Sequence, residues 1–239
     1  PKALRYDFGM TRRQFFTGSA NLSAWRGWKN LFQLALLGCA AILCAKTSAA
    51  SVSEPVPPVV SPAETRRFSA TDYGATGDGQ TLNTVALQKA IDDIAAKGGG
   101  TLRIPPGTFV TGSIFLKPGV NLHLAAGAVL KGSTTLKDYP AVITRIEGLQ
   151  QLLVAALINA SNCPHLLIDG AGTMHGSGKP FWVAFWQAIT RNPRTMNVEV
   201  KRPRLMFLEQ CHDARIAGLH LKNSGFWNVH VYGCDHLVI

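Results

Sequence analysis

Three features that would place a protein in a common functional class are missing from this 239-residue sequence. The main apolar run, residues 31–45, has the length of a signal-peptide core and is too short for a comfortable membrane span. The basic residues form no clustered stripe with aromatic neighbours, so we predict no nucleic-acid partner. Neither a CxxC pair nor a Cys/His cluster has zinc spacing, and we expect no metal and no cofactor.

A disulfide framework is also not indicated by the cysteines. Cys39 and Cys44 lie near the amino terminus, which leaves an odd number, Cys163, Cys211 and Cys234, in the rest of the chain. An odd number argues against complete pairing. We interpret these three as buried thiols that serve as small apolar residues, although stacked neighbours would be close enough for a bridge.

The last third of the sequence repeats around these three cysteines. Apolar residues follow each cysteine at the third and fifth positions, and a segment with the same alternation precedes it. This period of two predicts short strands on both sides of each cysteine. The residues concerned are Leu166 and Ile168, Ala214 and Ile216, and Leu237 and Ile239 after the cysteines, and Ile158 and Ala160, Met206 and Leu208, and Val229 and Val231 before them.

The spacing of the cysteines predicts a solenoid. Cys234 follows Cys211 by 23 residues, and Cys211 follows Cys163 by 48, an excess of 25 that matches a non-repetitive stretch at residues 177–201. Short strands with glycine corners and no helical period in the shorter repeat predict an all-β fold, the single-stranded parallel β-helix. In this fold like residues stack about 4.8 Å apart. An antiparallel sandwich with a coincidental cysteine repeat is the alternative.

Basic residues are concentrated at the amino-terminal end. Residues 1–50 hold seven Lys and Arg against one acid, whereas residues 51–239 hold 17 against 13. Residues 11–16 (TRRQFF) resemble a twin-arginine export signal, and residues 46–50 (KTSAA) offer small residues for cleavage. We therefore predict an export leader over residues 1–50, a periplasmic or secreted protein, and no stable membrane contact after cleavage. An uncleaved anchor or a lipid-modified Cys39 is the alternative.

The predicted folded domain covers residues 66–239. Residues 51–65 carry four prolines and are expected to be an extended linker. A helix capped by Asn83 or Thr84 and ended by residues 98–100 (GGG) would cover the open end of the solenoid. Residues 136–151 and 179–201 are predicted to be loops. The apolar face of the helix would consist of Val85, Leu87, Ala90, Ile91, Ile94 and Ala95.

Five segments together resemble glycoside hydrolase family 28, the polygalacturonases and their relatives, over residues 66–239. Each segment is short, but they occur in the family's order and at appropriate distances. They are residues 72–79 (DYGATGDG), 98–107 (GGGTLRIPPG), 168–176 (IDGAGTMHG), 202–204 (RPR) and 223–230 (NSGFWNVH) with Cys234. Departures from the family pattern are His175 in place of an aspartate, and Gly225 and Val231 in place of prolines.

This resemblance implies a right-handed β-helix and an enzyme that hydrolyses pectin with inversion and without a metal. We also expect a monomer. Inverting glycosidases need two carboxyl groups, one to protonate the leaving oxygen and one to activate water. The family carries them in an N-T-D segment and a D-D pair, with G-H-G and R-x-K segments beyond, and none of these is present. The spacing of the repeat places the N-T-D segment in the coil after Cys234. We therefore name no catalytic residue, and we expect a fragment truncated at its carboxyl-terminal side that is inactive alone.

His230 is the single substrate-binding residue that we predict. It alternates with apolar residues in the strand before Cys234, in column with Asn159 and Phe207. The family's acids would stack on that strand in the next coil, so His230 is expected to border the groove and to contact sugar hydroxyls or carboxylates. A surface histidine with a local hydrogen bond is the alternative.

Other candidates receive structural interpretations. Asp169, beside a glycine, is expected to be a turn residue, and Trp227 to pack in the core or in a corner rather than to stack on a sugar. Two further functions stay open: a pectate lyase, and a non-catalytic adhesin or carbohydrate-binding β-helix. The aromatic residues after Lys179 are Phe181, Trp182, Phe185 and Trp186. They could stack on sugars, but we favour the alternative that they cover the flank of the solenoid.

Overall fold

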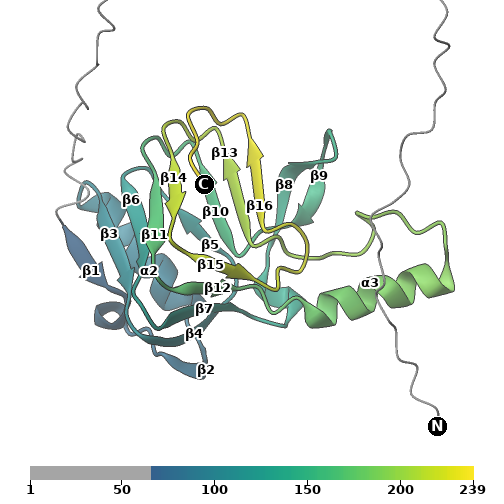
Figure 1. Cartoon of the computed structure of the whole chain (residues 1–239), viewed down its shortest axis with the longest axis horizontal. Coiled ribbons are helices and arrows are strands. Elements are labelled where there is room, and N and C mark those ends of the chain that lie inside the picture. Colours follow the sequence, from purple (N-terminus) through teal and green to yellow (C-terminus); the bar gives the residue numbers. More distant parts are fainter. Residues whose placement is uncertain (1–65) are drawn as a thin grey trace, which may run out of the picture. The chain divides into compact units, whose positions relative to one another are not determined.

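The computed structural model describes residues 66–239, which form a stack of coils with three parallel sheets (Figure 1). The predicted leader and linker lie outside these residues. We call the sheets A, B and C. Sheet A contains β1 (Arg67–Ser69), β3 (Gly100–Ile104), β6 (Val120–Leu124), β11 (Leu167–Gly170) and β14 (Arg215–Ala217). Sheet B contains β2 (Asp78–Leu82), β4 (Gly107–Thr111), β7 (Ala128–Gly132), β12 (Thr173–His175) and β15 (His220–Lys222). Sheet C contains β5 (Ile114–Leu116), β10 (Ile158–Ser161), β13 (Met206–Glu209) and β16 (Val229–Tyr232).

Successive strands belong to different sheets, and each strand pairs in parallel with its equivalents in neighbouring coils. This is the right-handed single-stranded parallel β-helix that the repeat and the resemblance predicted. Outside it, one antiparallel pair occurs among the described strands, β8 (Ala141–Ile146) with β9 (Leu149–Val154). The sandwich alternative is therefore excluded.

The cysteine repeat has the predicted register. Ile158 lies opposite Met206, which lies opposite Val229, so like positions stack from coil to coil. The three thiols are free, and the backbone N–H of Cys211 donates to the sulfur of Cys234 at 3.3 Å. Cys163 and Cys211 are buried, as expected of small apolar residues in the core, whereas Cys234 is only partly buried.

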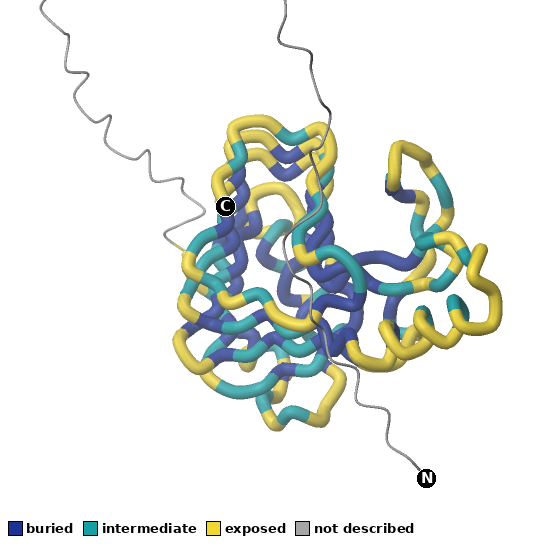
Figure 2. Tube along the Cα trace, turned by 45° about the vertical axis from the view of Figure 1, so that its right-hand side comes forward, coloured by how far each residue is buried: buried dark blue, intermediate teal, exposed yellow. Residues whose placement is uncertain are grey.

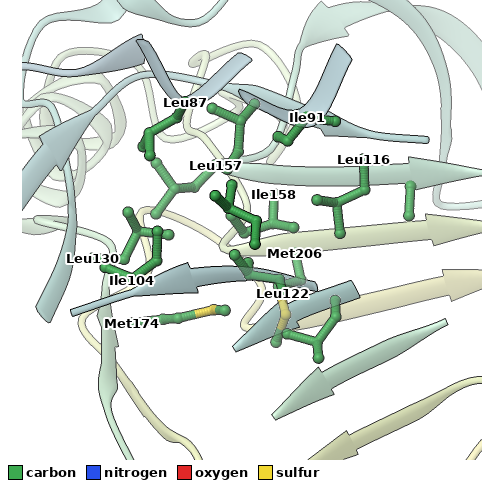
Figure 3. Packing of buried hydrophobic residues seen from close by; sticks show 14 of the residues in the cluster. Leu87, Ile91, Ile104, Leu116, Leu122, Leu130, Leu157, Ile158, Met174 and Met206 are labelled. Atoms are coloured by element: carbon green, nitrogen blue, oxygen red, sulfur yellow. The ribbon is translucent and has the colours of Figure 1, made fainter. Parts of the chain in front are cut away.

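Inward-facing aliphatic residues of the three sheets fill the interior of the coils, as the buried inner positions in Figure 2 show. Leu122 from sheet A, Leu130 from sheet B and Ile158 from sheet C all lie in this one cluster and are fully buried (Figure 3). Burying each such side chain stabilises the fold by about 1.5–3 kcal/mol. The continuous core requires every coil to keep the same register.

The predicted helix is α2 (Thr84–Ala96), and it adds Leu87 and Ile91 to the same cluster (Figure 3). Val85 was wrongly placed on its apolar face, because this side chain is 83% exposed. Asn83 is the N-cap residue but makes no capping hydrogen bond. Its amide instead bonds Thr76 and the carbonyls of Thr81 and Val110. That α2 covers the open end of the solenoid stays a prediction.

Two predicted loops contain regular structure. Residues 136–151 begin with a short 3-10 helix, η2 (Leu136–Asp138), and continue into the β8–β9 hairpin, whose two-residue turn places Glu147 and Gly148 at positive φ. Residues 179–201 contain α3 (Lys179–Arg191), with Pro180 in its first turn. The loop predictions were wrong because neither stretch shares the repeat that revealed the coils.

These two insertions lie at equivalent places in successive coils. The β8–β9 hairpin joins β7 of sheet B to β10 of sheet C, and α3 joins β12 of sheet B to β13 of sheet C. Both insertions therefore lie at the end of sheet C where its strands begin, as Figure 1 shows for β8, β9 and α3. The outer face of sheet C is thus flanked by these two insertions.

None of the described helices is long and apolar enough to cross a membrane.

Candidate functional site

His230 lies on the outer face of sheet C, in the predicted column. Asn159 is opposite Phe207, which is opposite His230. The column is less open than expected, because Asn159 and Phe207 are only 6% and 4% exposed. The Asn159 amide bonds the backbone of Ala156, in the segment that returns from the hairpin to sheet C. His230, at the end of this column, is partly exposed.

The ring of His230 is held by a local hydrogen bond. Arg204 donates from its guanidinium to Nδ1 at 2.7 Å. Because a guanidinium only donates, Nδ1 must be unprotonated, and the proton of the neutral ring is on Nε2. Burial, followed by the charge of Arg204, lowers the pKa of His230. The result is a neutral imidazole whose Nε2–H has no hydrogen-bond partner among residues 66–239.

Aromatic rings fix the orientation of this imidazole. The ring centre of His230 lies 5.0 Å from that of Phe207 and 4.8 Å from that of Trp227, edge to face in the second case. Trp227 also stacks on Phe226 at 4.8 Å. The prediction that Trp227 packs in the core or in a corner agrees with this position, two residues before β16, although the packing includes the candidate residue.

Arg204 connects sheet C to the hairpin. The residue is 2% exposed, and its guanidinium donates to Thr144 Oγ1 at 3.0 Å and to the carbonyl of Arg145 at 3.4 Å. It also lies 4.3 Å from the ring centre of Phe207. Burial lowers the pKa of Arg204 to about 10, which leaves it charged at neutral pH. The sequence showed Arg204 only as part of a family segment, and its positioning role was missed.

A second outward column beside His230 adds polar groups. Ser161 lies opposite Glu209, which lies opposite Tyr232. Glu209 accepts a hydrogen bond from Ser161 at 3.3 Å, and the guanidinium of Arg145, from β8, lies 4.9 Å from the ring centre of Tyr232. Arg145, Tyr232 and the free N–H of His230 give this end of sheet C one cation, one aromatic ring and one hydrogen-bond donor.

Glu209 is the only carboxylate on the described strands of sheet C. An inverting glycosidase needs two carboxyl groups about 6.5–9.5 Å apart, so these strands do not supply the pair. Among residues 66–239, no three or more His, Cys, Asp or Glu side chains are placed to hold a metal ion.

Asp169 lies on a different sheet. It is part of strand β11 in sheet A rather than a turn residue, and its carboxylate lies 2.7 Å from Nδ1 of His123 on the neighbouring strand β6. The turn interpretation was wrong because the adjacent Gly170 ends a strand here. Asp169 does not join the His230 site.

The aromatic residues of α3 divide into two groups. Phe181 is buried and packs edge to face on Tyr139, while Phe185 lies 3.9 Å from the guanidinium of Arg202. Trp182 and Trp186 are 37% and 61% exposed. The first group covers the flank of the coils as favoured, whereas the second group is open to solvent.

The fold and this site can be compared with known proteins. The family model described as "Rhamnogalacturonase A/epimerase, pectate lyase-like" matches residues 67–147. A probable polygalacturonase of Vitis vinifera is 33% identical over 180 residues, which is 71% of this chain and 35% of that protein. Over the matched residues, the chain is similar to polygalacturonases. It spans about a third of the length of this relative.

Solved structures show the same similarity to polygalacturonases. An exopolygalacturonase of Thermotoga maritima superposes with a TM-score of 0.62 at 25% identity, covering 72% of this chain and 45% of that one. A family 28 exopolygalacturonase of Yersinia enterocolitica gives a TM-score of 0.61 at 25% identity, with 72% and 37% covered. The resemblance stated from the sequence segments is therefore confirmed for the part of the chain that is matched.

Proposed function

We propose that this polygalacturonase-like chain binds a galacturonan-type acidic polysaccharide along the outer face of sheet C, and that the activity it serves is the hydrolysis of glycosidic bonds in pectin. The observation that carries the proposal is the His230 site, at the end of a polygalacturonase-like stack of coils and beside the insertions that flank sheet C. The Vitis vinifera relative is named a probable polygalacturonase, and the Thermotoga maritima structure is named an exopolygalacturonase.

The chemistry of the site suits such a ligand. A guanidinium such as that of Arg145 pairs with a uronate carboxylate. An aromatic ring such as that of Tyr232 presents an apolar face and a hydroxyl to a sugar. The Nε2–H of His230 donates to a hydroxyl or carboxylate oxygen while its other nitrogen is occupied by Arg204.

Binding without turnover is the proposed behaviour of this chain on its own. Bond cleavage by inversion requires one carboxyl group as acid and another as base in one groove. The described strands of sheet C carry a single carboxylate, that of Glu209. A pectin substrate lies outside the cell, so the proposal includes export directed by residues 1–50 and a periplasmic or secreted location. A monomer is proposed for the same chain.

Titration of the full chain with tetragalacturonate, followed by tryptophan fluorescence and calorimetry, tests the binding site. Trp227 lies against His230, so a ligand at this site is expected to change the emission. Arg145→Ser and His230→Ala are each expected to weaken binding about tenfold, the cost of about one charge-assisted hydrogen bond. Trp186→Ala, on the exposed side of α3, is the matched control and should bind like the wild type.

Two results would contradict the proposal. If both site variants bind with unchanged affinity and unfold near the temperature of the wild type, the ligand does not bind at the proposed site on sheet C. Release of reducing sugars from polygalacturonate by this chain would contradict binding without turnover.

A further inference from the structure

The outer face of sheet A carries a hollow, on a different sheet from His230. Its volume is about 250 Å³. The lining residues come from β1, β3, β6 and β11, and they are Arg67, Thr101, Arg103, His123, Leu167 and Asp169. Side chains of neighbouring coils thus converge on one place outside the site already described.

The parallel register brings the two arginines together. Arg67 on β1 lies opposite Thr101 on β3, and Arg103 is two residues further along β3 on the same outward face. Neighbouring coils lie about 4.8 Å apart, so the two guanidinium groups can reach the same small ligand. Two positive charges therefore border one hollow.

These two cations have no carboxylate partner among residues 66–239. The carboxylate in the hollow, Asp169, is paired with His123 at 2.7 Å. Neither Arg67 nor Arg103 forms an ion pair or a side-chain hydrogen bond within the described part of the chain. Unpaired guanidinium groups at the edge of a hollow favour an anionic ligand.

We propose that this hollow is a second binding site of the protein, which takes the carboxylates of an acidic saccharide through Arg67 and Arg103. Guanidinium groups bind carboxylates through paired N–H···O bonds, and arginines on successive coils suit a polymer whose charges recur along its length. The choice of a uronate as the ligand rests on the function proposed above. The location on sheet A is independent of it.

This site differs chemically from the one on sheet C. Among residues 66–239, its lining includes no Phe, Tyr or Trp, so none of the described aromatic rings stacks on the sugar and charge supplies most of the attraction. Attraction between partly exposed charges is screened by salt. Binding on sheet A is thus expected to weaken at high salt more steeply than binding beside Tyr232 and Trp227.

Calorimetric titration of the full chain with tetragalacturonate at low and at high salt tests the inference. The wild type is expected to show two classes of site at low salt, with only the class on sheet C resisting high salt. The double variant Arg67→Ser with Arg103→Ser should lose the salt-sensitive class, weakened at least about tenfold, and keep the other. Arg145→Ser should show the opposite pattern.

A matched control removes the same amount of charge elsewhere. Lys131 and Lys222 occupy one outward column of sheet B, each opposite His175, and Lys131→Ser with Lys222→Ser also removes two cations. This control should keep both classes. If it loses the salt-sensitive class as fully as the arginine variant does, bulk charge explains the binding and the inference is overturned.

Other outcomes separate the two proposals. A single salt-resistant class that disappears in Arg145→Ser overturns the inference and leaves the sheet C site standing. A salt-sensitive class that is lost only in the arginine variant supports the inference even if Arg145→Ser has no effect. Equally tight binding of a short single-stranded oligonucleotide, lost in the same variant, would show an unselective anion site and overturn the uronate assignment.

Discussion

The two kinds of connection around sheet C differ in how much they vary. From sheet C to sheet A, the corner has the same length in three successive coils, at residues 162–165, 210–213 and 233–236. From sheet B to sheet C, the connection contains the β8–β9 hairpin in one coil and α3 in the next. The constant corners keep the coils in register, and the variable connections flank the candidate site.

The constant corners share an unusual backbone. The first and last residues of each have positive φ, 53° and 55° at Asn162 and His165 and 51° and 53° at Gln210 and Asp213. Their N–H groups donate to carbonyls of the next coil, from Asn162 to Glu209 at 2.9 Å and from His165 to His212 at 2.8 Å. The left-handed conformation is unfavourable for most residues, and these hydrogen bonds between coils offset its cost.

The largest expected effect comes from changing the length of a constant corner. An alanine inserted between Cys211 and His212 would shift β14 by one residue and turn its buried side chains outward. We expect a loss of more than about 3 kcal/mol in the free energy of unfolding, measured by urea denaturation. The same insertion between Arg194 and Thr195, after α3, should cost under about 1 kcal/mol. Equal losses would show that the corner does not set the register.

A core substitution compares the inside of the coils with α3. Leu208 on β13 is fully buried, and Leu208→Ala is expected to cost about 2–5 kcal/mol through lost burial and a cavity. Val183→Ala on α3, where the side chain is 46% exposed, should change stability by less than about 0.5 kcal/mol. Thermal unfolding of both variants would check the contrast, and a comparable drop in each would refute it.

Removing the Arg204 guanidinium tests how the hairpin is attached. Arg204→Met leaves Thr144, the Arg145 carbonyl and Nδ1 of His230 without this donor, at a cost of about 1–3 kcal/mol. Limited proteolysis should then cut the β8–β9 hairpin faster than in the wild type. Arg194→Met, beyond the end of α3, serves as the control. Unaltered cleavage in Arg204→Met would mean that other contacts hold the hairpin.

The smallest effect is the dependence of stability on pH through His230. Its pKa is lowered in the folded state, so the unfolded chain binds the proton first as the pH falls below about 6.5. The contribution of His230 to the free energy of unfolding is therefore present above that pH, and it is lost as the pH falls through the pKa of His230 in the folded state. We expect under about 1 kcal/mol, because the ring is partly exposed. A His230→Gln variant with the same pH profile as the wild type would contradict this.

Much of the fold could be read from the sequence because a solenoid repeats its pattern. Alternating apolar residues around Cys163, Cys211 and Cys234 determined the strands, their parallel pairing and the stacked thiols. The column that contains His230 followed from the same spacing. A buried core of this kind accepts only one register, so local periodicity is sufficient to predict it.

The tertiary structure alone decided what surrounds that column. Arg204 and His230 are 26 residues apart and meet only because their coils stack, and His123 and Asp169, 46 residues apart, pair for the same reason. The hairpin and α3 were missed because they interrupt the repeat and their positions depend on partners elsewhere. Periodicity fixes which side of a strand a residue occupies, whereas contacts between distant side chains depend on how the coils and insertions pack together.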